Sequence, residues 1–143
     1  DAGFVQPFLN RLNTTLTFGA TEYVGRRYSE RNTNTGAGGR TSTNVILSTT
    51  RGELVIAPAS GKIDLAEDLG GDYGTTLVID HGAGVRTIFY GLSDIDIKAG
   101  QQVKQGQTLA TCGKTTVVEM RIGTVPIDPI AVWRGQCNGL KYY

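Results

Sequence analysis

The stretch that decides the fold runs from Gly71 to Gly113 and reads GDYGTTLVIDHGAGVRTIFYGLSDIDIKAGQQVKQGQTLATCG. Short apolar runs alternate in it with glycine-rich turns, which is typical of antiparallel strands joined by tight turns. TTLVIDHG and VRTIFYGLSDI each predict a strand, and HGAG joins the two as a hairpin. Gly100 and Gly106 mark the next turns. The stretch therefore predicts an all-β fold, arranged as a sandwich or a barrel.

The segments on both sides of this stretch also predict strands. NVILST, which begins at Asn44, predicts one strand, and GELVIAPASGKIDLAEDL predicts two, broken between Pro58 and Gly61. PIDPIAVW, which ends at Trp133, predicts a turn and a short closing segment. No convincing amphipathic helix follows residue 27, so the prediction stays all-β.

The segment TTVVEMRIG, which ends at Gly123, alternates at period two. One face of this strand would carry Val117, Glu119 and Arg121, and the opposite face is apolar throughout. Two interpretations of the Glu119–Arg121 pair stay open. The pair lines a groove, or it belongs to a solvated face.

Composition narrows the class of protein. The 143 residues include 14 Lys+Arg and 13 Asp+Glu, a formal net charge of +1, which argues against a dedicated nucleic-acid binder. No apolar stretch approaches about 18 residues, so the chain has no predicted membrane segment. Because it begins at Asp1 without a methionine, we expect a processed or trimmed product, and a segment removed before Asp1 could have tethered it.

The ends of the chain differ from its middle. Residues 1–44 predict an N-terminal arm and a long polar loop (residues 26–44) that pack on a β domain over residues 45–133, followed by a tail over residues 134–143. Cys112 and Cys137 permit one disulfide, which would indicate an oxidising compartment. Two unpaired thiols remain the alternative.

Four segments follow one another along the chain: GELVIAPASGKI, the stretch quoted above, EMR and IDP. Their order resembles the LytM or M23 family of peptidoglycan endopeptidases. The resemblance runs from about Asn44 to Trp133. It implies an antiparallel β-sheet groove with one Zn²⁺ on its floor, held by an H-x-x-x-D pair and the second histidine of H-x-H. Two further histidines would assist a zinc-bound water.

Carried over residue by residue, the resemblance implies that the ligands and catalytic histidines are missing. The five family site positions hold Ser42, Ile46, Gly91, Thr115 and Val117. Aliphatic side chains cannot coordinate zinc, and the one histidine of the chain cannot fill three histidine positions. We therefore expect no catalysis, no metal and no cofactor. Glu119 and Asp128 keep the family's residue types.

The one histidine, His81, follows Asp80 in the turn of the quoted stretch. In the family this turn lies outside the metal site, so we expect the imidazole to bond nearby backbone or Asp80. A nucleophile at Ser42 or Ser93 with His81 as its base is disfavoured, because no G-x-S-x-G motif is present.

A fold that is retained without its metal ligands and catalytic histidines predicts a binding module. The resemblance implies an extracytoplasmic, periplasmic module of the bacterial envelope that binds a partner protein and regulates peptidoglycan remodelling, with an amidase as the leading partner. A structural scaffold in a secretion, sporulation or virion assembly is the alternative, and binding of peptidoglycan itself is a third reading. Tyr90, Glu119 and Arg121 are the candidate groove-lining residues, over a floor made more apolar by Ile46 and Val117.

Overall fold

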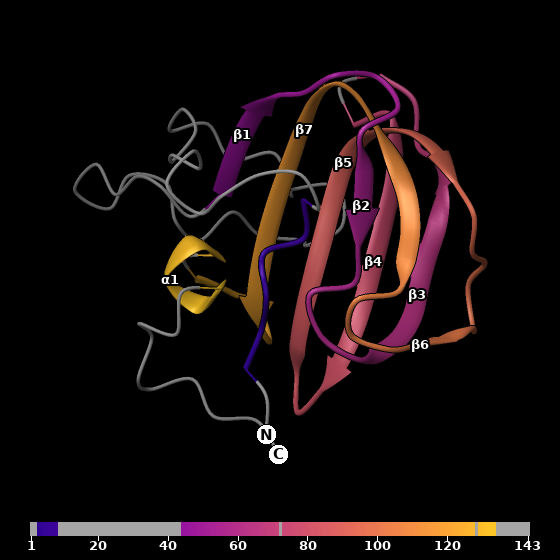
Figure 1. Ribbon diagram of the computed structural model, residues 1–143. Helices are drawn as coiled ribbons and strands as arrows, with labels where there is room; N and C mark the ends of the chain where they lie inside the picture. The colour runs from indigo at the N-terminus through magenta and orange to yellow at the C-terminus, as the bar shows by residue number, and fades with distance from the viewer. Residues whose placement is uncertain (1–2, 9–43, 72, 128, 134–143) are drawn as a thin grey trace.

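The computed structural model describes residues 3–8, 44–71, 73–127 and 129–133 (Figure 1). The all-β prediction is confirmed, since the described part forms a curled antiparallel sheet with one short helix. Its elements are β1 (Asn44–Ser48), β2 (Leu54–Ile56), β3 (Gly61–Asp68), β4 (Thr75–Gly82), β5 (Val85–Ile95), β6 (Gln102–Val103), β7 (Thr108–Ile122), β8 (Val125–Ile127) and α1 (Pro129–Trp133).

The sheet is built around β7, the longest strand. The strands follow in the order β1-β7-β5-β4-β3-β6, while β2 and β8 also pair with β7. β5 runs along one edge of β7; β2, β1 and β8 occupy successive parts of its other edge. Figure 1 shows β7 arching over, so that β2 and the first part of β7 lie across from the strands β4 and β5. The sheet thereby curls and encloses its own core.

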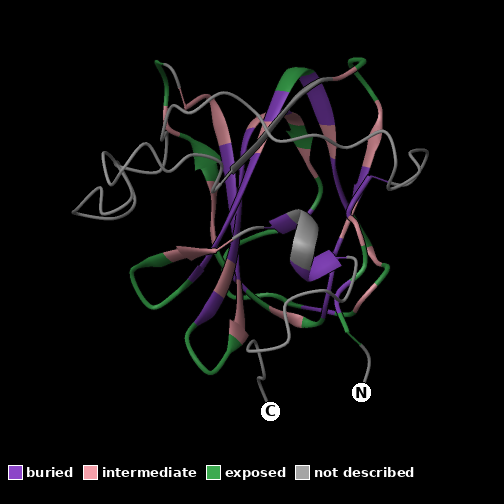
Figure 2. Ribbon diagram, turned by 90° about the vertical axis from the view of Figure 1, so that its left-hand side faces the viewer, coloured by how far each residue is buried: buried purple, intermediate pink, exposed green. Residues whose placement is uncertain are grey.

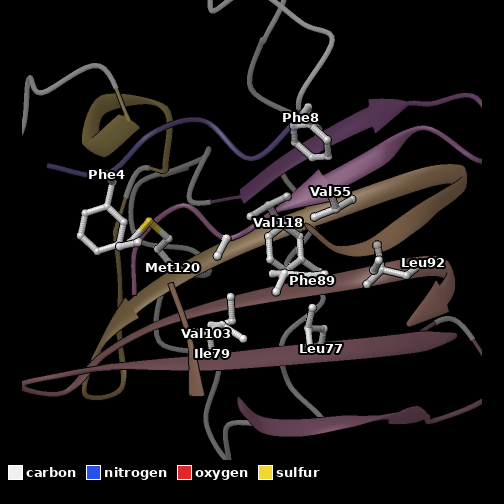
Figure 3. Close-up of a cluster of buried hydrophobic side chains, with 14 of the residues drawn as sticks. Phe4, Phe8, Val55, Leu77, Ile79, Phe89, Leu92, Val103, Val118 and Met120 are labelled. Carbon is white, nitrogen blue, oxygen red and sulfur yellow. The ribbon is translucent and has the colours of Figure 1, made fainter. Parts of the chain in front are cut away.

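The main core lies inside this curl. It gathers the apolar residues of one sheet face, among them Val55, Leu77, Ile79, Phe89, Val118 and Met120 (Figure 3). Buried residues run along the strands, and exposed residues gather at the turns (Figure 2). This separation follows from the period-two alternation that the sequence predicts.

The N-terminal segment 3–8 belongs to this core. Phe8 is fully buried and forms an isolated β-bridge with Val55, and Phe4 is buried as well. The Val5 amide donates to the Pro58 carbonyl at 2.9 Å. Residues 3–8 thus pack on the β domain, whereas the rest of the predicted arm, the predicted loop over residues 26–44 and the tail lie outside the described residues, except for Asn44.

The structure defines two elements more closely than the sequence does. The closing segment at Pro129–Trp133 forms the one-turn helix α1, and its Val132 and Trp133 are buried in the main core. The strand predicted around TTVVEMRIG begins earlier, at Thr108. The sequence Gly113–Lys114 interrupts the apolar pattern there, but the strand continues through it.

The hairpin between β4 and β5 forms as predicted. Gly82 pairs with Val85, and the two residues between them, Ala83 and Gly84, have φ of 54° and 81°. Positive φ at both central residues is the type I′ turn that matches the twist of a hairpin. Ala83 holds a conformation that alanine adopts only at an energetic cost.

We predict that Ala83→Asn stabilises the fold by about 1 kcal/mol, because asparagine tolerates the left-handed conformation and Asn-Gly is the preferred type I′ pair. Chemical denaturation of both proteins measures the free energy of unfolding. Ala99→Asn is the matched control, since Ala99 also precedes a glycine but lacks positive φ. Equal effects of the two substitutions would show that the turn conformation is not the cause.

Candidate functional site

The candidate site lies on the sheet face opposite the main core. We call it the site face and define it by Tyr90 on β5 and by Val117, Glu119 and Arg121 on β7. The register places Val117 between Ile46 of β1 and Tyr90 of β5. Ile46 and Val117, two of the positions that the resemblance assigns to zinc ligands, are therefore direct cross-strand partners.

Gly91, which the resemblance assigns to a catalytic histidine rather than to a ligand, sits where β5 and β7 change direction together. The register on β7 jumps from Val117 to Cys112 across this one residue. Gly91 has φ of 79°, and a Cβ atom there would collide with the Thr115 carbonyl oxygen. Gly113 approaches from the other strand, since its Cβ would lie 2.6 Å from the Gly91 oxygen. The backbone itself, as well as the residue type, excludes a side chain at position 91.

The residues of β7 beside this corner are fixed from their other edge. The Thr49 hydroxyl donates to the Gly113 carbonyl at 2.6 Å and lies 3.1 Å from the Thr116 hydroxyl. The Thr49 amide donates to the Lys114 carbonyl at 2.8 Å. Thr115, which the resemblance assigns to the other catalytic histidine, is exposed. The Thr115 carbonyl oxygen, which leaves no room for a Cβ atom at position 91, thus belongs to a segment held by several hydrogen bonds.

Tyr73 covers the centre of the site face. Its carbonyl accepts a hydrogen bond of 3.1 Å from the Gly91 amide. Its ring packs on that of Tyr90, with centroids 5.6 Å apart and an angle of 48° between the planes. Both rings join a second hydrophobic cluster, separate from the main core, that also contains Leu65, Val78, Ile88 and Val117. The sequence pattern indicates only a turn at Tyr73, so its place on this face was not predicted.

Glu119 and Arg121 form a buried ion pair beside this cluster. The Arg121 Nη2 lies 3.5 Å from the Glu119 Oε1, and both side chains are only 2% exposed. Arg121 Nη1 also donates to the Thr124 carbonyl at 3.1 Å. Desolvation by burial lowers the pKa of Arg121 to about 10. The interpretation of this pair as a solvated face is therefore wrong.

His81 lies away from the site face and supports the N-terminal segment. Its Nδ1 is 2.8 Å from the Ser60 carbonyl, and its Nε2 is 2.8 Å from the Thr87 hydroxyl. Since a carbonyl only accepts, Nδ1 carries the hydrogen and Nε2 accepts from Thr87. Phe4 contacts the ring edge-on at 4.9 Å between centroids. The imidazole bonds nearby backbone as expected, with Thr87 rather than Asp80 as its side-chain partner.

Burial makes this histidine hard to protonate. Desolvation lowers the pKa of His81 below its ordinary value of 6.5, while the Ser60 carbonyl and the Asp80 carboxylate oppose the shift. The neutral imidazole, donating from one nitrogen and accepting at the other, therefore fits its surroundings.

The described residues do not form a zinc site. Within that part of the chain, no three His, Cys, Asp or Glu side chains gather where a metal ion would be held. Val117, at a ligand position of the resemblance, is aliphatic and offers no donor atom to a metal ion. Ser42, Asp128 and Cys137 lie outside the described residues, so the assignment of Ser42 and the disulfide from the buried Cys112 stay predictions. The described helix α1 is too short to cross a membrane.

With this geometry in place, comparison with known proteins gives the family. The family model for peptidase family M23 matches residues 40–129, more than half of the chain. The protein belongs to peptidase family M23.

Two curated relatives support this assignment. The chain is 32% identical over 95 residues to an uncharacterized metalloprotease of Haemophilus influenzae, which is 62% of this chain and 20% of the relative. It is 33% identical over 95 residues to the cell division protein DipM of Caulobacter vibrioides, 57% of this chain and 16% of the relative. The chain therefore spans about a fifth of the length of these relatives.

Solved structures share the fold at low sequence identity. A zinc-containing peptidase from Vibrio cholerae superposes with a TM-score of 0.67 at 22% identity, over 91% of this chain and 40% of that one. A chain from the complex of SpoIIIAH and SpoIIQ superposes with a TM-score of 0.66 at 18% identity, over 89% of this chain and 97% of that one. The antiparallel M23 fold predicted from the sequence is thereby confirmed.

We predict that Gly91→Ala destabilises the protein by about 3 kcal/mol or more, because it adds both left-handed strain and a collision with the Thr115 carbonyl. Urea denaturation measures the loss. Gly52→Ala is the matched control, since Gly52 has φ of 96° but a Cβ added there would meet no atom within 4 Å. It should cost about 1 kcal/mol from backbone strain alone. Similar losses for the two variants would contradict the steric account.

We also predict a pH dependence of stability that comes from His81. Because its folded-state pKa lies below the ordinary 6.5, the unfolded chain binds the proton more readily. The free energy of unfolding should therefore fall as the pH drops below about 6.5. Urea denaturation between pH 8 and pH 5 measures the slope for the protein and for His81→Gln, which contains no histidine. Identical slopes would rule out His81 as the source.

Proposed function

We propose that this protein is a non-catalytic M23 domain of the bacterial cell envelope, periplasmic in location, that binds a partner protein and regulates peptidoglycan remodelling, with a cell-wall amidase as the partner. The observation that carries the proposal is the row Ile46–Val117–Tyr90. Two positions assigned to metal ligands meet there as aliphatic residues, next to an aromatic one. M23 membership supports the envelope setting, as does the relative named as a cell division protein.

The side chains at Ile46, Val117 and Tyr90 are better suited to binding a partner protein than to hydrolysis. Zinc hydrolysis requires nitrogen, sulfur or oxygen ligands and an open coordination position. Valine and isoleucine supply none of these atoms, and the chain has only one histidine, which is bonded at both ring nitrogens on the opposite side of the sheet. Ile46 and Val117 therefore supply no ligand for the metal ion that M23 hydrolysis would need.

A partner would instead contact apolar and aromatic surface. Tyr73 and Val117 are half-buried members of the second cluster, and Thr115 beside them is exposed. Partly exposed aromatic and aliphatic side chains on a rigid sheet are typical anchor positions for a partner's apolar side chain. The buried Glu119–Arg121 pair lies on the adjoining residues of β7.

A second candidate is a structural scaffold in a secretion, sporulation or virion assembly. The observation that favours it is the likeness to a chain of the SpoIIIAH–SpoIIQ complex, in which this fold accounts for 97% of the matched chain. In both candidates the site face or a sheet edge contacts another protein, and the identity of the partner separates them.

The test combines a metal measurement with an activation assay. We expect the purified protein to bind no stoichiometric Zn²⁺, to release no fragments from labelled peptidoglycan, and to raise the hydrolysis rate of a purified cell-wall amidase. Because one relative is named a metalloprotease, hydrolysis is measured with added zinc as well. Stoichiometric zinc together with peptide-bond cleavage would overturn the proposal. Capture of an assembly subunit without amidase stimulation would favour the scaffold.

Val117→Asp should lower amidase stimulation about tenfold, since a charge in an apolar contact removes the energy of one anchor residue. Val125→Asp is the matched control, because Val125 is 58% exposed on β8 and lies outside the site face. Thermal melts establish that both variants fold. Equal stimulation by the two variants would show that the partner does not use the site face.

A further inference from the structure

The outer edge of β3 is only partly paired within the part of the chain that the structure describes. β3 pairs with β4 from Lys62 to Asp68, but with β6 only at Gly61 and Lys62. Hydrogen bonds between Ile63 and residues 100 and 101 extend this second pairing by one residue. Among the residues that the structure describes, no strand pairs with the outer edge of Leu65–Asp68, and Figure 1 shows β3 near the right-hand margin of the sheet. A strand edge of this kind is a template for another chain.

The side chains of Leu65–Asp68 divide into an apolar pair and an acidic pair. Leu65 packs against the second cluster and Ala66 against the main core, and both are only partly buried. Glu67 and Asp68 are exposed. A strand laid along this edge would complete the burial of the first two residues and meet the carboxylates of the other two.

The charges determine which strand fits. In an antiparallel pair with a second copy of this edge, Asp68 would stand opposite Leu65 and Glu67 opposite Ala66, so both carboxylates would lack a basic partner and self-pairing is not favoured. Asp64 is already engaged within the sheet, because Arg86 lies 3.3 Å from its carboxylate. We propose that the β3 outer edge binds an extended segment of another protein in which two basic residues adjoin two apolar residues.

The register makes the motif specific. In an antiparallel addition, basic residues stand opposite Asp68 and Glu67, and apolar residues stand opposite Ala66 and Leu65. The motif therefore reads basic-basic-apolar-apolar. The four residues of the edge alternate between the two faces of the sheet. The two basic residues of the bound segment would therefore lie on opposite faces. This proposal concerns β3 and not the site face, so it stands or falls independently of the loss of catalysis.

The experiment uses a fluorescein-labelled peptide, Thr-Lys-Lys-Val-Val-Thr, blocked at both ends, and the same peptide with glutamates in place of the lysines. Fluorescence anisotropy at low salt should show binding of the lysine peptide and none of the glutamate peptide. Hydrogen exchange of the complex should show slower exchange at Leu65–Asp68. Double substitution of Glu67 and Asp68 by lysine should weaken binding of the lysine peptide about tenfold or more and allow the glutamate peptide to bind.

Glu53→Lys is the control for a change of net charge, since Glu53 precedes β2 on the far side of β7. It should leave the affinity within about twofold, because Glu53 carries the same change of net charge but does not lie on β3. Equal binding of both peptides, equal weakening by Glu53→Lys and by the β3 substitutions, or protection at residues 115–121 instead of 65–68 would each overturn the proposal.

Discussion

The close approach of Gly91 to the Thr115 carbonyl is the constraint on which the rest of the structure depends. β5 and β7 pair on both sides of this point, yet residues 113–116 of β7 stand against the single residue Gly91. Only backbone without a Cβ fits between the strands here, because Gly113 faces Gly91 in the same way. The strands therefore change direction together, and β7 can serve both parts of the curled sheet. The core forms inside this curl.

The same corner shapes the site face. At this corner the Gly91 amide donates a hydrogen bond to the Tyr73 carbonyl, and the Tyr73 ring packs on the Tyr90 ring. Aromatic contact then shields Val78 and Ile88, both fully buried in the second cluster. Next to this apolar region, the Glu119–Arg121 pair is nearly removed from solvent. Such a pair adds little net stability, because desolvation offsets most of its attraction, but losing either partner would leave a buried charge. The face is therefore well packed at its centre and sensitive to substitution beside it.

The strands and turns could be predicted from the sequence because local patterns determine them. The hairpin of β4 and β5 follows from alternation and from HGAG, and its ends agree with the prediction. The full length of β7 could not be predicted, because Gly113 and Lys114 break the alternation, and the backbone hydrogen bonds of this part to Thr49 and Gly52 come from distant residues of the chain. Tyr73 was missed for a similar reason. Its sequence context indicates a turn, and only its contact with Tyr90 reveals its place on the site face. Its one local signal was an aromatic residue within a glycine-rich turn.

The structure excludes ligand or catalytic side chains more firmly at some of the assigned site positions than at others. Ile46 and Val117 occupy regular paired positions, where substitution changes a side chain and leaves the backbone path intact. Gly91 is different, since its left-handed conformation and the Thr115 carbonyl exclude every side chain, including histidine. Restoring ligands at Ile46 and Val117 would therefore supply donor atoms for a metal without the histidine that the resemblance places at position 91. Under the proposed function, the loss at position 91 is tied to the path of the backbone, because the corner that curls the sheet would have to be rebuilt before that histidine could return.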